Sequence, residues 1–99
     1  MAYDPGALNA SLAAAVGADP ELLAELRAAF VESAARQADL MRRARCDANW
    51  NISASRLKSV AASFGVVGLV ALADEALTGA PGDPVVLRKI AAALDDFAA

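Results

Sequence analysis

Serine and lysine side chains recur at helical spacing in residues 54–65, which read Ala-Ser-Arg-Leu-Lys-Ser-Val-Ala-Ala-Ser-Phe-Gly. At about 100° per residue, Ser55, Lys58, Ser59 and Ala62 fall on one side of a helix. A serine hydroxyl is a candidate nucleophile, although it is a weak one unless a neighbouring base activates it. These four positions are therefore the first place to look for a functional surface.

The same segment carries a second stripe, which is apolar. Leu57, Val60, Ala61 and Phe64 follow the i, i+3, i+4, i+7 spacing of a helix face that packs into a core. Ser55 lies about 200° around the helix from Leu57. Spacing alone therefore predicts that Ser55 faces solvent while the apolar stripe faces the protein interior.

The residues around Ser55 offer no base that could activate it. The chain contains no histidine, and the positions one turn away on the same face hold Asn51, Ile52, Lys58 and Ser59. Without histidine and with one cysteine, a structural zinc site is excluded in practice. The sequence therefore predicts no catalytic residue, no metal site and no cofactor, so we do not expect an enzyme.

The remaining reactive side chains, a cysteine and two acidic pairs, are not predicted to be catalytic either. Cys46 is predicted to end a helix, where the negative end of the helix dipole disfavours a thiolate, although the adjacent arginines act in the opposite direction. Asp74-Glu75 and Asp95-Asp96 are adjacent pairs on predicted solvent faces. A glycosidase-type dyad needs two carboxylates across a cleft. We interpret these acidic pairs as solubility charges.

The elements that position these residues are predicted to be helices. Twenty-seven of the 99 residues are alanine, the best helix former, and strand formers are few. Asp-Pro pairs at 19–20 and 83–84 are typical helix starts, and Asp47-Ala48-Asn49 reads as a break. The predicted helices span residues 5–15, 20 to about 46, 50–64, 66–78 and 84 onward, with Gly65 ending the third.

Short connections favour antiparallel neighbours, so we expect one domain over residues 1–99. Its fold class is all-α, an up-down antiparallel four-helix bundle with a short extra N-terminal helix. The inward stripe of the long helix is Leu23, Leu26, Phe30, Ala34, Gln37, Met41 and Ala44. The inward stripe of the last helix is Val86, Leu87, Ile90, Ala91, Leu94 and Phe97.

Composition limits the classes of partner. The net charge of −3 and the pI of about 4.7 argue against a nucleic-acid-binding domain. The arginines at 36, 42, 43 and 45 are interpreted as a favourable cationic helix C-terminus. The apolar run 60–73 is shorter than the about 18 residues that a membrane span needs. With no signal-peptide pattern and a single cysteine, we expect a cytoplasmic protein that does not bind membranes.

Residues 55–65 resemble the signature of histidine-containing phosphotransfer (HPt) domains, His-x-Leu-Lys-Gly-x-[Ser/Ala]-x-x-x-Gly. The positions that fall on the pattern are Leu57, Lys58, Ala61 and Gly65. Ser59 takes the small-residue position, and Ser55 stands where the family has its phosphorylated histidine. The order and lengths of the predicted helices are also similar to those of this family, so the resemblance extends over most of the chain.

The resemblance implies a role in a bacterial-type two-component phosphorelay. In HPt domains the receiver domain of a response regulator or hybrid kinase docks over the exposed histidine and exchanges a phosphoryl group with its own aspartate. The lysine three residues later helps to balance the phosphoryl charge, and the small residue after it leaves room for docking. By this resemblance, Ser55 is a degenerate phospho-acceptor position, and Ser55, Lys58, Ser59 and Ala62 would bind the partner.

Three interpretations stay open at this point. The chain is an interaction module that keeps the docking surface without phosphotransfer, because a serine phosphate ester is too stable to donate readily to aspartate. Alternatively, it is a genuine phosphotransfer protein whose acceptor histidine was replaced by engineering at Ser55. A third possibility is a structural or dimerising helical bundle.

Overall fold

The computed structural model describes residue 17 and residues 19–98. This part of the chain is all-helical and contains no strand. Its helices are α2 (Pro20–Arg43), α3 (Asp47–Ser63), α4 (Val67–Thr78) and α5 (Pro84–Ala98). The helix predicted for residues 5–15 lies outside the described residues.

Both predicted Asp-Pro helix starts are confirmed. Asp19 is the N-cap of α2, and its carboxylate accepts a hydrogen bond of 3.0 Å from the backbone N–H of Glu21. Before α5, the Asp83 carboxylate accepts one of 2.9 Å from the backbone N–H of Val85. In each case the side chain satisfies an amide that has no partner within its own helix.

The connection between α2 and α3 differs from the prediction. Helix α2 ends at Arg43, not near Cys46, and α3 begins at Asp47, inside the predicted break. Ala44 and Cys46 have extended backbones, so the helical conformation is interrupted between α2 and α3. The predicted break at Asp47 is wrong for a physical reason: a carboxylate in the first turn of a helix is stabilised by the positive end of the helix dipole. Cys46 therefore precedes a helix as its N-cap and does not end one.

The end of α3 follows the prediction. Gly65 has a φ of 71°, a left-handed conformation that glycine adopts without the penalty of a Cβ. Its N–H donates to the carbonyl of Ala62 at 3.1 Å, and the N–H of Val66 donates to that of Ala61 at 2.9 Å. This pair of bonds is a Schellman motif. It turns the chain within a few residues and lays α4 beside α3.

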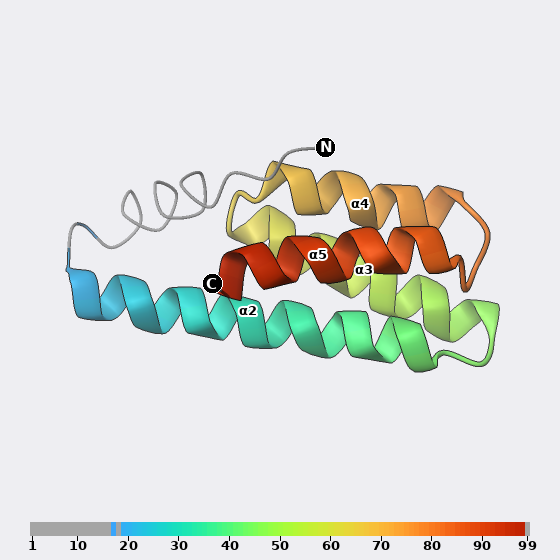
Figure 1. Ribbon diagram of the computed structural model, residues 1–99, viewed down its shortest axis with the longest axis horizontal. Coiled ribbons are helices and arrows are strands. Elements are labelled where there is room, and N and C mark those ends of the chain that lie inside the picture. Colours follow the sequence, from blue (N-terminus) through green and yellow to red (C-terminus); the bar gives the residue numbers. More distant parts are fainter. Residues whose placement is uncertain (1–16, 18, 99) are drawn as a thin grey trace.

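The helices pack side by side as a helical bundle (Figure 1). Helix α3 contacts α2 and α4, and α5 also contacts α2 and α4. Each helix therefore buries part of its surface against two neighbouring helices. None of the helices in the described ranges is long and apolar enough to cross a bilayer.

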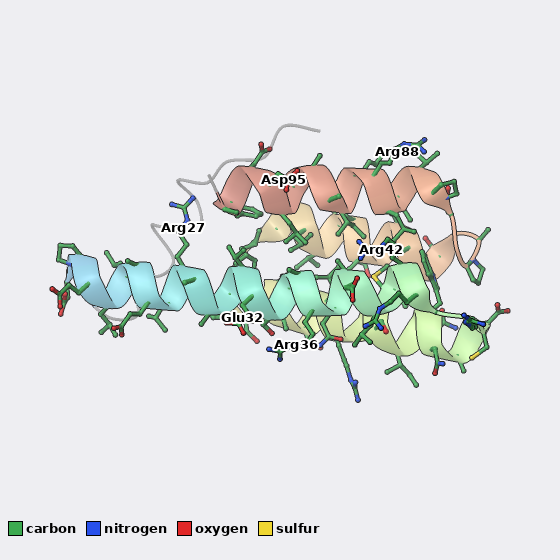
Figure 2. The ribbon with its side chains drawn as sticks, turned by 60° about the horizontal axis from the view of Figure 1, so that its bottom comes forward. Arg27, Glu32, Arg36, Arg42, Arg88 and Asp95 are labelled. Atoms are coloured by element: carbon green, nitrogen blue, oxygen red, sulfur yellow. The ribbon has the colours of Figure 1, made fainter. Side chains whose placement is uncertain are left out.

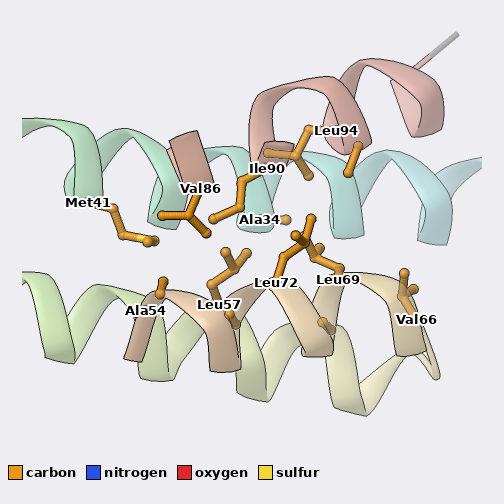
Figure 3. Close-up of a cluster of buried hydrophobic side chains, with 14 of the residues drawn as sticks. Ala34, Met41, Ala54, Leu57, Val66, Leu69, Leu72, Val86, Ile90 and Leu94 are labelled. Atoms are coloured by element: carbon orange, nitrogen blue, oxygen red, sulfur yellow. The ribbon is translucent and has the colours of Figure 1, made fainter. Parts of the chain in front are cut away.

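Buried side chains from all four helices meet in the core (Figure 3). Phe30 of α2 contacts the ring of Phe64 at a centroid distance of 5.1 Å and the ring of Phe97 at 5.7 Å. Trp50 is buried, and its indole Nε1–H donates to the carbonyl of Ala76 at 3.0 Å. These contacts join α2, α3, α4 and α5 to one another.

The predicted inward stripe of α5 is correct except at one position. Val86, Ile90, Leu94 and Phe97 are buried and Leu87 is half-buried, but Ala91 is exposed. Ala93 is buried in its place. Ala91 lies about 100° around the helix from Ile90, beyond the arc that α2 and α4 cover. On α2, Phe30, Ala34 and Met41 are buried, and the other predicted inward residues are half-buried.

Candidate functional site

The outward side of α3 carries the residues that the sequence singled out. Ser55, Ser59 and Ala62 are exposed and Lys58 is half-buried, whereas Leu57 is fully buried on the opposite side. The predicted opposition of the two stripes is therefore confirmed. Helix α3 positions the first set because its apolar face is held between α2 and α4.

Serine hydroxyls on this side fold back onto their own helix. The Ser59 hydroxyl donates to the carbonyl of Ser55 at 3.1 Å, and the Ser63 hydroxyl donates to that of Ser59 at 2.8 Å. The Ser55 hydroxyl makes no hydrogen bond to any other described residue. Ser59 thus uses its hydroxyl as a donor within α3, and Ser55 keeps a free hydroxyl beside it.

Lys58 is tied to the neighbouring helix. Its Nζ lies 2.7 Å from Oδ1 of Asp74 on α4, and about half of each side chain is exposed. The next residue, Glu75, forms a similar pair in the other direction, with Lys89 of α5 at 2.9 Å. The adjacent carboxylates that the sequence indicated as solubility charges therefore also join α4 to both of its neighbours.

Sequence reasoning missed the partner of Lys58, although a signal was present. Lys58 and Asp74 each lie eight residues from Val66, at the turn between α3 and α4. In two helices joined by a tight turn, residues equally far from the turn come side by side. The equal spacing could therefore have predicted Asp74 as the partner of Lys58.

One further apolar residue belongs to this surface. Ile52 precedes Ser55 by three positions and is 48% exposed, which is high for a large aliphatic side chain. We refer to Ile52, Ser55, Ser59 and Ala62 as the α3 outer face. This face carries no charge of its own, and its neighbours Arg56 and Lys58 supply cations beside it.

The chemistry open to this arrangement is limited. The Ser55 hydroxyl contacts no base among the described residues, and the ammonium group of Lys58 is already paired with Asp74. No group of three histidine, cysteine or acidic residues that could hold a metal ion occurs in residues 17 and 19–98. None of these contacts activates the Ser55 hydroxyl as a nucleophile.

The arginine cluster lies on α2 and at its end. Arg36 pairs with Glu32 at 3.4 Å, and Figure 2 shows both on the surface of α2. Arg42 and Arg43 form ion pairs with Asp39, the latter at 2.9 Å. Arg42 and Arg43 also lie in the last turn of α2, so the predicted cationic helix C-terminus is confirmed for these two arginines. Arg36 lies earlier in α2, and Arg45 lies beyond its end.

Comparisons of the chain with protein-family models, with curated proteins and with solved structures found no match.

Proposed function

We propose that this chain is an HPt-like signalling module that docks a receiver domain on the α3 outer face without phosphotransfer. Ser55 would occupy the position of the acceptor histidine, with Lys58 and Ser59 beside it. The proposal includes an up-down antiparallel bundle completed by a short helix over residues 5–15. The partner is the receiver domain of a response regulator or hybrid kinase.

The observation that carries the proposal is the placement of Ser55. It is exposed on an uncharged helix face, three residues before a lysine and four before a small residue, which is the arrangement that the motif requires. Ser59 supports the proposal further, because its hydroxyl is folded back onto the Ser55 carbonyl. A partner can therefore approach α3 closely at this point.

The absence of phosphotransfer in the proposal follows from the chemistry of serine. Imidazole is nucleophilic near neutral pH and forms a phosphoramidate that readily passes its phosphoryl group on. A serine hydroxyl without a base does neither. Such a module would regulate its partner by occupying the docking surface.

The test is binding to the receiver domains of the same organism, measured by calorimetry. Relay encounters are transient, so an interface near or below about 1,200 Å² and weak, reversible binding are expected. Ser59→Arg should weaken binding more than Lys58→Ala, because bulk at Ser59 blocks close approach. Ala91→Arg is the matched control, since Ala91 is an equally small, exposed residue on α5.

The outcome that contradicts steric docking is equally specific. If Ser59→Arg binds as well as the parent while Lys58→Ala abolishes binding, an electrostatic contact governs the interface. Circular dichroism should first show that each variant keeps its helical content. If no receiver domain binds the parent chain, the proposal is wrong.

A homodimer is the second candidate, and exposed aliphatic residues favour it. Val67 is 78% exposed at the start of α4, and Ile52 is 48% exposed on α3. Covering such apolar surface with a second molecule removes it from water and lowers the free energy. Sedimentation equilibrium measures this directly: a concentration-dependent mass that Ile52→Ser and Val67→Ser abolish would support the dimer.

A further inference from the structure

A groove runs between the end of α2 and the first half of α3, next to the α3 outer face. Its polar lining consists of Arg43, Asn49, Ser53 and Arg56. Ile52 lines the groove as well as belonging to the α3 outer face, so the two surfaces are continuous. Nothing in the proposed docking surface accounts for this set of polar groups.

Ser53 is the unusual member of the set. It is 94% buried, since only 6% of its surface is exposed, and it is the one buried polar residue of the described chain. Ser59 and Ser63 donate their hydroxyls to carbonyls one turn back, but the Ser53 hydroxyl makes no hydrogen bond to any described residue. Its oxygen is not sealed from solvent, because the one fully buried polar side-chain atom without a partner among the described residues is Oε1 of Gln37. The Ser53 hydroxyl can therefore be reached from the groove that Ser53 lines, and it is free to donate to a bound group.

The two arginines of the groove can still bind an anion. Arg56 is exposed and forms no ion pair with any described residue. Arg43 uses its Nε to bind Oδ2 of Asp39 at 2.9 Å, and no other nitrogen of Arg43 contacts a described carboxylate. A guanidinium group presents its donors as a planar fork that matches a carboxylate. Arg43 therefore already binds one carboxylate and has donors left for a second.

The charge of the chain is also divided in a way that favours an acidic partner here. The segment 32–56 contains five arginines and three acidic residues, whereas the rest of the chain contains four basic and nine acidic residues. The groove thus lies in a stretch of net positive charge, in a protein whose net charge is negative. An acidic segment of a partner would be attracted to this end of the molecule and repelled by the remainder.

We propose that the groove binds a carboxylate side chain of the protein partner that docks on the α3 outer face. Arg56 and Arg43 supply the charge, while the Ser53 hydroxyl and the Asn49 amide donate hydrogen bonds to the carboxylate oxygens. The identity of the partner rests on the proposed function, but the carboxylate site does not. Such a site would fix the register of the partner along α3.

The test is a nuclear magnetic resonance titration of the ¹⁵N-labelled chain with a hexaglutamate peptide at low ionic strength. Inorganic phosphate at matched ionic strength forms a second arm. Arg56→Gln and Ser53→Ala are the test variants. Arg88→Gln is the matched control, because Arg88 is an exposed arginine on α5 without an ion pair to any described residue (Figure 2). Fluorescence of Trp50, the only tryptophan, monitors folding.

The peptide should shift the amide signals of Asn49, Ile52 and Ser53, and Arg56→Gln should weaken its binding about fivefold. Ser53→Ala should weaken it measurably, and Arg88→Gln should leave it unchanged. Equal losses in Arg56→Gln and Arg88→Gln, or no effect of Ser53→Ala in a folded variant, would overturn the site. Binding of phosphate without binding of the peptide would overturn the choice of a carboxylate.

The same variants separate this inference from the proposed function. Hexaglutamate binding at the groove in a chain that binds no receiver domain would leave the carboxylate site intact and refute the docking role. Receiver binding that Arg56→Gln and Ser53→Ala leave unchanged, with no peptide binding, would refute the site and leave the docking role intact.

Discussion

Lys58 of α3 and Asp74 of α4 form an ion pair of 2.7 Å across the two helices. The pair holds the ammonium group toward α4, to one side of Ser55, and neutralises it with a carboxylate. An exposed pair of this kind contributes at most about 1 kcal/mol to stability. The pair also bears on the proposed function, because Lys58 would have to leave Asp74 before it could balance the charge of a phosphoryl group on a histidine introduced at position 55.

We expect the chain not to accept a phosphoryl group in the manner of a histidine. It contains no histidine, and the Ser55 hydroxyl contacts no base among the described residues. The measurement is incubation with a phosphorylated receiver domain or a sensor kinase, followed by a test for label that is acid-labile and base-stable. Label of that kind on the parent chain would falsify the expectation.

Ser55→His should restore at least partial phosphoryl acceptance if the docking surface is intact. Ser55 is exposed, so this substitution should change the free energy of unfolding by about 0.5 kcal/mol or less. Radiolabel transfer from a phosphorylated receiver domain measures acceptance. A folded Ser55→His variant that no receiver of the same organism phosphorylates would mean that the partner is something else.

The ion pair predicts a second effect on that variant. Adding Asp74→Asn to Ser55→His should raise the rate of phosphoryl acceptance, because Lys58 is then released to balance the phosphoryl charge. Glu75→Gln is the matched control, since Glu75 pairs with Lys89 of α5 at 2.9 Å and not with Lys58. Equal rates with Asp74→Asn and with Glu75→Gln would show that the Lys58 pairing does not limit the reaction.

Local signals in the sequence were sufficient for the starts of α2 and α5, for the end of α3 and for the exposure of Ser55, but they misplaced the connection between α2 and α3. Asp-Pro pairs and Gly65 act within one turn of the chain, and the facing of α3 depends only on its periodicity. Features that depend on the packing of two helices were harder to predict from the sequence. The pairing of Lys58 with Asp74 and the burial of Ser53 toward the α2–α3 groove both require knowing how neighbouring helices pack.

Trp50→Phe should destabilise the protein by about 1–3 kcal/mol. The indole N–H donates at 3.0 Å to the carbonyl of Ala76, which lies in the last turn of α4 and has no helical N–H to accept from. Phenylalanine keeps much of the buried apolar surface but leaves that carbonyl without the donor. Urea unfolding followed by circular dichroism measures the loss. A loss no larger than that of an exposed substitution such as Ser55→Ala would show that the bond does not stabilise the bundle.

Gly65→Ala should destabilise the turn that lays α4 beside α3. The φ of 71° at Gly65 is left-handed, and a Cβ there costs about 1–2 kcal/mol. Gly65→Asn should cost less, because asparagine tolerates this conformation better than alanine does. Urea unfolding of the two variants, again followed by circular dichroism, provides the comparison.

The order of the two losses is the decisive result for Gly65. If backbone strain is the cause, alanine is the worse replacement although it is the better helix former. If Gly65→Ala is as stable as the parent, or if it is more stable than Gly65→Asn, α3 can continue past Ser63 and the Schellman bonds of Gly65 and Val66 do not determine where it ends. In that case Lys58 and Asp74 would also lose the fixed turn that brings them together.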